Sequence, residues 1–259
     1  MSALKAVLAM IAIVIVTMAH YGFLLATCLA LRVVGRPTLP WRMRLFRSWS
    51  RTLSSIMGMR LAVEGAPPAP PFVLVANHVG YVDVLALSAL VPGIFIAKAE
   101  IGGWPFIGAI CRSVNTVFID RRRIRDISRV LDDVNAMLHA GYGIVMFPEG
   151  RTSDGAAVHP FRSPLLEVAA RVGKGVHHAT LTYATPDGAP PARDVVSWHG
   201  GKNLVVHLYR LLTLPGFEAR ISFGEEGVRG DDRKELARRL HAAVSGSFTP
   251  LATDREAVG

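Results

Sequence analysis

The sequence has too few cysteines for a disulfide framework. Its two, Cys28 and Cys111, also lie outside any C-x-x-C or Cys/His cluster with metal-ligand spacing. The chain has no internal repeat, no G-x-S-x-G nucleophile elbow and no low-complexity tract beyond a short proline-rich stretch. These absences exclude a disulfide-stapled secreted domain, a repeat protein and a hydrolase built on a serine elbow, and they fit a reducing compartment.

Acidic residues are missing from the first part of the chain, where the first one is Glu64. An apolar run covers residues 6–31 and is long enough to cross a hydrocarbon layer of about 30 Å as a helix. A signal peptide is the alternative, but the run is long for a signal core and Arg32 follows it without a small-residue cleavage site. Seven arginines precede the first acid, and the positive-inside tendency therefore predicts a domain on the cytoplasmic side of the cell (inner) membrane.

Residues 41–59 alternate apolar and basic side chains at helical spacing. Such a pattern predicts an amphipathic helix in the headgroup layer, or alternatively a helix that packs on the following domain. The net charge of +9 favours anionic partners, such as an anionic membrane surface, CoA or phosphate esters. Nucleic acid is not among the expected partners, because the basic segment adjoins an apolar run and no nucleic-acid motif is present.

The proline-rich residues 65–71 end any helix, so we divide the chain into membrane-anchoring helices at 1–64 and a catalytic domain at 72–259. In the second part, strand-like and helix-like patterns alternate, which predicts an α/β domain with a covered central sheet. We expect strands at 72–76, 94–98, 116–119, 143–147, 176–182 and 219–223. We expect helices at 83–90, 124–140, 164–172 and 231–244.

His78 and Asp83 lie five residues apart, a spacing that would separate them by about 140° on one helix. They can meet only if the histidine occupies a turn between the strand at 72–76 and the following helix. There the carboxylate would reach back to the imidazole, fix its tautomer and stabilise the imidazolium. The pair therefore predicts a general base that deprotonates a hydroxyl group.

A second polar cluster, Phe147-Pro148-Glu149-Gly150-Arg151-Thr152-Ser153, follows another buried-looking strand. A carboxylate, a guanidinium group and two hydroxyl groups on one rigid turn suit a ligand that carries both phosphate and hydroxyl groups. Arg121 and Lys98 each come at the end of a further strand, where α/β domains bind ligands, and we take them as additional phosphate-binding candidates.

These segments resemble the conserved blocks of the glycerolipid acyltransferases of the 1-acyl-sn-glycerol-3-phosphate acyltransferase type. The N-H-x4-D block stands at 77–83, the second block at 116–121 and the F-P-E-G-R-T-S block at 147–153, in the family's order. The resemblance implies the α/β fold of glycerol-3-phosphate and lysophosphatidate acyltransferases with a hydrophobic helical anchor. Two differences from the family concern substrate identity: His177 and His178 replace a proline-containing strand, and Pro164 stands where glycine is common. The two histidines lack a third partner for a metal site.

The resemblance also implies a reaction, namely fatty acyl transfer from acyl-CoA or acyl carrier protein to the free hydroxyl of lysophosphatidic acid in phospholipid biosynthesis, with no cofactor and no metal. His78 would be the base and Asp83 its orienting partner. Glu149, Gly150, Arg151 and Thr152 would bind the acceptor, helped by Arg121 and Lys98.

Two other functions stay open. One is acyl transfer to another lyso-lipid, such as a lyso-ornithine lipid or a glycolipid, a choice that residues 197–202 and 204–214 would influence. The other is a non-catalytic protein of the membrane surface, which explains the arginines but not the two motifs. The sequence leaves open the acyl-chain length, the donor, the oligomeric state, and whether the apolar helix spans the membrane or lies in one leaflet.

Overall fold

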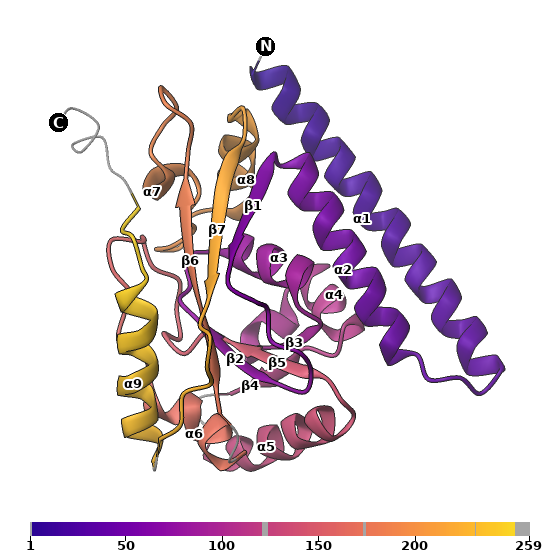
Figure 1. The fold of residues 1–259 in the computed structure, drawn as a ribbon. Helices are drawn as coiled ribbons and strands as arrows, with labels where there is room; N and C mark the ends of the chain where they lie inside the picture. The colour runs from indigo at the N-terminus through magenta and orange to yellow at the C-terminus, as the bar shows by residue number, and fades with distance from the viewer. Residues whose placement is uncertain (1, 121–123, 173–174, 231, 252–259) are drawn as a thin grey trace.

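The computed structural model describes residues 2–120, 124–172, 175–230 and 232–251, which form one α/β domain with a helical hairpin along its side (Figure 1). The helices of the described part are α1 (Ser2–Val33), α2 (Leu39–Ile56), α3 (Tyr81–Leu90), α4 (Ile107–Ser113), α5 (Ile124–His139), α6 (Ser163–Arg171), α7 (Ala192–Val195), α8 (Leu204–Thr213) and α9 (Arg233–Gly246), with a 3₁₀ turn at Ala99–Gly103. The strands are β1 (Met59–Glu64), β2 (Val73–Ala76), β3 (Gly93–Lys98), β4 (Val117–Ile119), β5 (Gly143–Met146), β6 (His177–Ala184) and β7 (Phe217–Phe223).

Within the described residues the seven strands form one mixed sheet in the order β1-β7-β6-β2-β5-β3-β4. The pairs β6–β2, β2–β5, β5–β3 and β3–β4 are parallel, so these strands end at the same edge of the sheet. β7 runs antiparallel to β6 and parallel to β1. The expected α/β fold with a covered central sheet is therefore confirmed, and every strand and helix expected after residue 71 is present with its ends within two residues of the expected ones.

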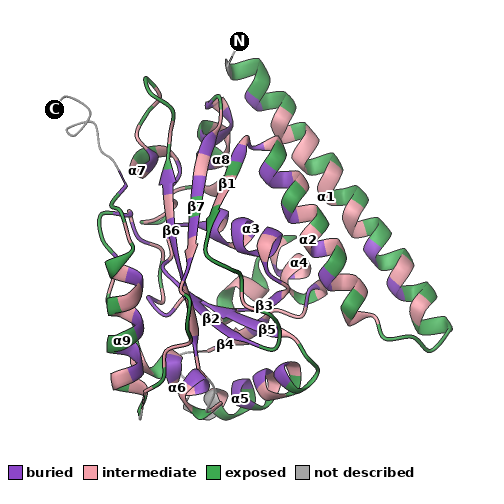
Figure 2. Cartoon of the chain, viewed as in Figure 1, coloured by how far each residue is buried: buried purple, intermediate pink, exposed green. Residues whose placement is uncertain are grey.

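Alternating side chains of β2 enter two separate cores, one on each face of the sheet. Leu74 and Ala76 pack against the side that carries α2, α3 and α8, whereas Val73 and Val75 pack against α5, α6 and α9. In Figure 2 the buried faces of these helices turn toward the sheet. The strand is buried on every residue, as expected for a parallel strand covered on both sides.

The boundary between anchor and domain differs from the expectation. Residues 59–64, which we assigned to the anchoring part, form β1, which pairs with β7 over six residues. Residues 59–64 become a strand because they pair with β7, which is distant in the sequence. The local sequence pattern near residue 60 does not indicate this pairing. The helices of the N-terminal part accordingly end at Ile56, and Met59 begins the sheet.

The basic helix α2 packs on the domain, which was the alternative we considered to a position in the headgroup layer. Phe46 and Leu53 are buried in the core beside α3. Arg47 donates to the carbonyl oxygens of Ala89 and Leu90, and Arg51 also donates to Ala89. These arginines therefore satisfy the unpaired carbonyl groups at the C-terminal end of α3.

The apolar helix α1 lies on the outer side of α2 (Figure 1). Lys5 donates to the carbonyl of Leu214 at 2.8 Å, and Trp49 Nε1 donates to Thr17 Oγ1 at 3.1 Å. Phe23 contacts Trp41 with 6.3 Å between ring centroids. One face of α1 is thus covered at several points along its length, whereas its other face exposes large apolar side chains.

Candidate active site

The candidate site lies at the edge of the sheet where β2, β5, β3 and β4 end. His78 follows β2 in a four-residue corner before α3, as the His78/Asp83 spacing predicted. Glu149 and its neighbours follow β5, the strand that pairs with β2. The parallel pairing therefore brings together the two motifs, which are 71 residues apart in the chain.

The Asp83 carboxylate organises this corner. Its Oδ2 accepts hydrogen bonds from the backbone N–H groups of Val79 and Gly80, at 2.7 and 2.9 Å. The same oxygen lies 2.6 Å from Nδ1 of His78. Asp83 is fully buried and in the first turn of α3, where the N-terminal end of a helix favours negative charge. A carboxylate held in this way accepts the Nδ1 proton, which leaves Nε2 of His78 as the basic nitrogen.

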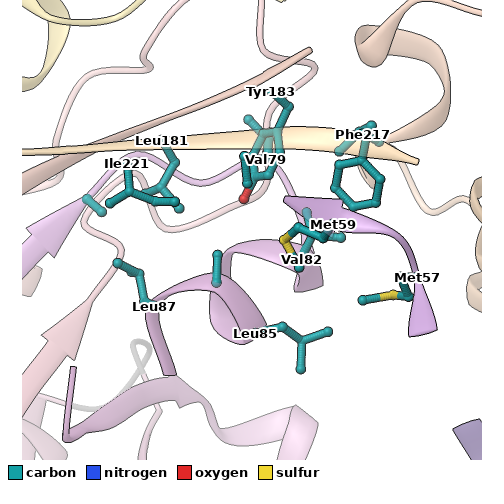
Figure 3. Packing of buried hydrophobic residues seen from close by; sticks show 14 of the residues in the cluster. Met57, Met59, Val79, Val82, Leu85, Leu87, Leu181, Tyr183, Phe217 and Ile221 are labelled. Carbon is teal, nitrogen blue, oxygen red and sulfur yellow. The ribbon is translucent and has the colours of Figure 1, made fainter. Parts of the chain in front are cut away.

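Tyr183 is a site residue that the sequence pattern did not indicate. Its hydroxyl donates to Oδ1 of Asp83 at 2.6 Å from the neighbouring strand β6, and its side chain is 2% exposed. Burial, with Asp83 as a second cause, raises the pKa of Tyr183 well above its usual value, so the phenol stays protonated and donates. Figure 3 shows Tyr183 among the buried side chains of this core, where its ring lies 6.3 Å from that of Phe217 between centroids.

The backbone of His78 is held by the second motif. Its N–H donates to Oε1 of Glu149 at 2.7 Å, and its carbonyl accepts from the N–H of Ser153 at 2.8 Å. Asn77 adds a two-way bridge to the backbone of Leu181 in β6, at 2.9 and 2.8 Å. Because both neighbouring strands contribute, the position of the imidazole is set by strand pairing and not by the corner alone.

Glu149 is 2% exposed, and its second oxygen accepts from the N–H of His159 at 3.2 Å. Burial is the main reason that its pKa rises to about 8, although the hydrogen bonds from His78 and His159 act in the opposite direction. Both oxygens are thus occupied by backbone donors. Glu149 thus ties the backbone of His78 to that of His159. The contact with the acceptor that the resemblance implied stays a prediction.

Aromatic side chains surround the imidazole and the corner. The Phe147 ring stacks on His78 with 4.0 Å between centroids and 9° between planes. Trp198 donates its backbone N–H to the carbonyl of Val79 at 2.8 Å. A Cβ at Gly80 would come within 3.1 Å of the Trp198 nitrogen, so a residue without a side chain is needed for this close approach. The segment at 197–202 therefore covers the corner, and its influence on acceptor choice stays a prediction.

Of the other proposed ligand-binding residues, those that the structure describes are more exposed than Glu149. Arg151 is exposed and Thr152 is half-buried beside it, while Gly150 has a left-handed φ of 75° that allows the turn. Lys98 pairs with Glu100 at 2.9 Å, and both side chains are 51% exposed. Arg121 lies outside the described residues. A ligand-facing role for these residues stays a prediction.

His177 and His178 lie at the start of β6, whereas His78 follows the end of the parallel strand β2. The ring of His178 packs against the backbone of Gly224, and its buried Nδ1 has no hydrogen-bond partner among the described residues. Burial lowers the pKa of both histidines. No group of three or more His, Cys, Asp or Glu residues in the described part of the chain could hold a metal ion.

The fold and the site define a protein of the α/β class that holds a histidine–aspartate pair at the edge of its sheet. The family profile described as Acyltransferase matches residues 60–184, a range that contains both motifs. The chain is 34% identical over 231 residues to the lyso-ornithine lipid O-acyltransferase of Pseudomonas aeruginosa, covering 87% of this chain and 88% of that protein. It is also 34% identical over 182 residues to the 1-acyl-sn-glycerol-3-phosphate acyltransferase of Neisseria meningitidis, covering 69% of this chain and 70% of that protein.

The fold is shared with the crystal structure of the 1-acyl-sn-glycerophosphate acyltransferase PlsC from Thermotoga maritima. The TM-score is 0.59 at 20% identity, and the match covers 92% of this chain and 95% of that chain. The protein therefore belongs to the acyltransferase family that contains these lyso-lipid enzymes, and it is an O-acyltransferase. The reading as a non-catalytic protein of the membrane surface is set aside.

Proposed function

We propose that this enzyme moves a fatty acyl group from an acyl thioester to the free hydroxyl of a lyso-lipid, with His78 as the general base. The observation that carries the proposal is the 2.6 Å contact between His78 Nδ1 and Asp83 Oδ2. It directs Nε2 away from the carboxylate, and that nitrogen has no hydrogen-bond partner among the described residues. The His78 side chain is 19% exposed, so a hydroxyl group can approach it.

In the proposed reaction the acceptor hydroxyl gives its proton to Nε2 while its oxygen attacks the thioester carbonyl. The tetrahedral intermediate collapses, the C–S bond breaks, and the thiolate leaves with the proton that His78 returns. Asp83 stabilises the imidazolium between these two steps. No acyl-enzyme is required, and a positioned base of this kind contributes roughly 10²–10⁴-fold to rate.

The second motif has two tasks in this proposal. Glu149 and Ser153 hold the His78 backbone from both sides, at 2.7 and 2.8 Å. Arg151 and Thr152 stand at the exposed end of the same loop, where a guanidinium group suits an anionic headgroup. We keep Arg121 and Lys98 as further candidates for that headgroup, and acyl-CoA or acyl carrier protein as candidate donors without a cofactor.

Two acceptors are supported by different observations. The exposed arginine of the F-P-E-G-R-T-S loop favours a phosphate group, as in lysophosphatidic acid. Lyso-ornithine lipid is favoured by the relative from Pseudomonas aeruginosa, which has that name and matches 87% of this chain at 34% identity. The relatives named for glycerol phosphate match 69% of this chain in Neisseria and 82% in sheep and cattle, the latter at 30% identity. An ornithine headgroup carries a carboxylate and an ammonium group, so it would place different demands on the same loop.

A paired acceptor assay distinguishes the two. Purified full-length protein would be given lysophosphatidic acid, lyso-ornithine lipid and a lyso-glycolipid in separate reactions, each with acyl-CoA and with acyl carrier protein. We expect one acceptor to give kcat/KM at least about tenfold above the others, because a missing headgroup contact costs about 1–3 kcal/mol. Failure to acylate any lyso-lipid hydroxyl with either donor would overturn the proposal.

We also propose that α1 lies in one leaflet on the cytoplasmic side of the inner membrane and does not span it. Residues 3–33 are apolar enough for a span, and only 6% of the most apolar window is buried. A span has lipid or other membrane-embedded helices on all sides. One face of α1 is instead covered near Lys5, Thr17 and Phe23 by α2 and α8, which pack on the α/β domain. A helix covered on one side and apolar on the other suits a position in the plane of the interface.

A further inference from the structure

A groove of about 380 Å³ lies between the second half of α1, the start of α2 and the helix α4. Its floor is formed mainly by one apolar stripe of α1, namely Leu24, Leu25, Cys28 and Leu29. Leu24 and Cys28 are 7% exposed, whereas Leu25 and Leu29 are 53% and 65% exposed. The stripe therefore passes from the protein interior to the apolar outer face of α1, the face that we propose contacts the membrane.

Three arginines from three different helices also line the groove: Arg32 in the last turn of α1, Arg42 in α2 and Arg112 in the last turn of α4. The described lining contains no Asp or Glu. None of the three guanidinium groups forms an ion pair with a carboxylate in the described part of the chain. The groove is thus apolar along its floor and cationic at its edge.

Two of these guanidinium groups are fixed in place by neutral partners. Nη1 of Arg42 donates to Oδ1 of Asn115 at 2.7 Å, and Arg112 donates to the carbonyl oxygen of Gly102. One such bond leaves most of the five N–H donors of an arginine available. Fixed arginines that keep free donors and have no carboxylate partner are suited to bind phosphate oxygens.

We propose that this groove binds one anionic phospholipid of the bilayer, with its phosphate among Arg32, Arg42 and Arg112 and an acyl chain along the stripe of α1. We assign the site to a diacyl lipid of the membrane and not to the lyso-lipid acceptor. The groove residues belong to α1, α2 and α4, and none of them lies in the two motifs that form the catalytic corner. A lipid bound there would join the hairpin to α4 and fix the orientation of the domain on the membrane.

The test measures lipid binding without acyl transfer, so it can succeed or fail independently of the proposed reaction. Full-length protein in neutral detergent micelles would receive phosphatidylglycerol or phosphatidylcholine, and its melting temperature would be recorded. A lipid that binds the folded protein at ten times its Kd should raise the melting temperature by roughly 3–6 °C for a chain of this size. We expect that rise with phosphatidylglycerol and at most a small rise with phosphatidylcholine.

The informative variant is Arg42→Gln with Arg112→Gln, which removes two groove charges. Its matched control is Arg36→Gln with Arg44→Gln, because these exposed residues lie near the same hairpin turn, outside the groove lining, and the loss of charge is equal. Only the groove variant should lose the rise, together with the phosphatidylglycerol that native mass spectrometry detects on the wild type. Equal loss in both variants would mean general surface attraction and would overturn the site, as would an unchanged rise in the groove variant.

A third variant separates loss of the phosphate site from loss of structure. Asn115→Gly removes the partner of Arg42 while every charge stays, and glycine accepts the φ of 60° at this position. We expect this variant to keep at least half of the rise given by phosphatidylglycerol. If it loses the rise as completely as the double arginine variant, the packing of α2 against α4, and not phosphate binding, explains the effect and the proposal is rejected.

Discussion

Oδ2 of Asp83 lies 2.6 Å from Nδ1 of His78 and also accepts the N–H groups of Val79 and Gly80, at 2.7 and 2.9 Å. One oxygen thus orients the imidazole and closes the first turn of α3. The second oxygen accepts the Tyr183 hydroxyl at 2.6 Å. The carboxylate is therefore fixed by groups on both sides of the corner, so the imidazole has a defined orientation before any substrate binds.

Replacing the base tests its role directly. We expect His78→Ala to lower kcat by about 10²–10⁴-fold, because the acceptor hydroxyl then lacks a positioned base. The protein should still float with liposomes, since the α1 surface is unchanged. Acyl transfer would be followed by the release of free thiol from acyl-CoA. A variant that keeps more than a tenth of the wild-type kcat would rule out His78 as the base.

Replacing Tyr183 by Phe tests the buried donor to Asp83. The change removes one hydrogen bond to a charged acceptor, worth about 1.5–3 kcal/mol, and leaves the ring in place. We expect a lower melting temperature and a fall in kcat with little change in the KM for the acceptor, because Tyr183 acts through Asp83 and is too buried to touch substrate. Tyr209→Phe, on the half-buried side of α8, is the matched control. A changed KM with normal kcat would argue for a different role.

Glu149 gives the enzyme a pH-dependent stability. Its pKa is about 8 in the folded protein, above the ordinary value of 4.5, because burial disfavours the charged form. Because the pKa of Glu149 is higher in the folded than in the unfolded chain, the stabilisation that comes from its protonated form is fully present below pH 4.5. This stabilisation is lost as the pH rises from 4.5 through 8. Between these two pH values, Glu149 lowers the free energy of unfolding by at most about 1.4 kcal/mol per pH unit.

We therefore expect Glu149→Gln to reduce this slope. The amide oxygen can still accept the His78 N–H, whereas the NH₂ group cannot accept from His159, so the variant should also be less stable at pH 5. Melting temperatures between pH 5 and 9, compared with the exposed control Glu226→Gln, provide the measurement. Parallel curves for the wild type and Glu149→Gln would show that Glu149 does not titrate in this interval.

The corner between β2 and α3 was predictable because its signals are local. The spacing of His78 and Asp83 excluded a shared helix face, and the preceding apolar strand with Gly80 indicated a turn. Tyr183 and β1 were not predictable, since each depends on which strands become neighbours in the sheet. Tyr183 reaches Asp83 across 100 residues only because β6 pairs with β2.

The contacts of the arginines in α2 were also not predictable from the sequence. Their spacing indicated a basic stripe but not its partner, and lipid headgroups and helix C-terminal carbonyl groups attract arginine for the same electrostatic reason. Arg47 and Arg51 bind the end of α3, whereas Arg42 contacts Asn115. Which partner each arginine binds depends on where α3 and α4 lie in the folded domain. The spacing of residues in α2 does not predict that arrangement.

The outer face of α1 should carry the attachment to the membrane. Val14, Ile15 and Met18 are 62%, 62% and 57% exposed on this face. We expect their joint replacement by Ser to reduce the fraction of protein that floats with liposomes by at least about tenfold, because each loses roughly 1.5–3 kcal/mol of apolar burial in lipid. The melting temperature in detergent should change little, since these side chains do not face α2.

A second variant shows whether the effect belongs to this face. Arg44→Ser with Ser48→Ala and Thr52→Ala alters three side chains of α2, of which Arg44 and Ser48 are exposed, and leaves the apolar face of α1 intact. We expect it to float nearly as well as the wild type, because burial of apolar area contributes more than one cationic side chain near a surface, about 1 kcal/mol. If this variant detaches while the α1 variant stays bound, the attachment is electrostatic and runs through α2, and the position of α1 in the leaflet would be wrong.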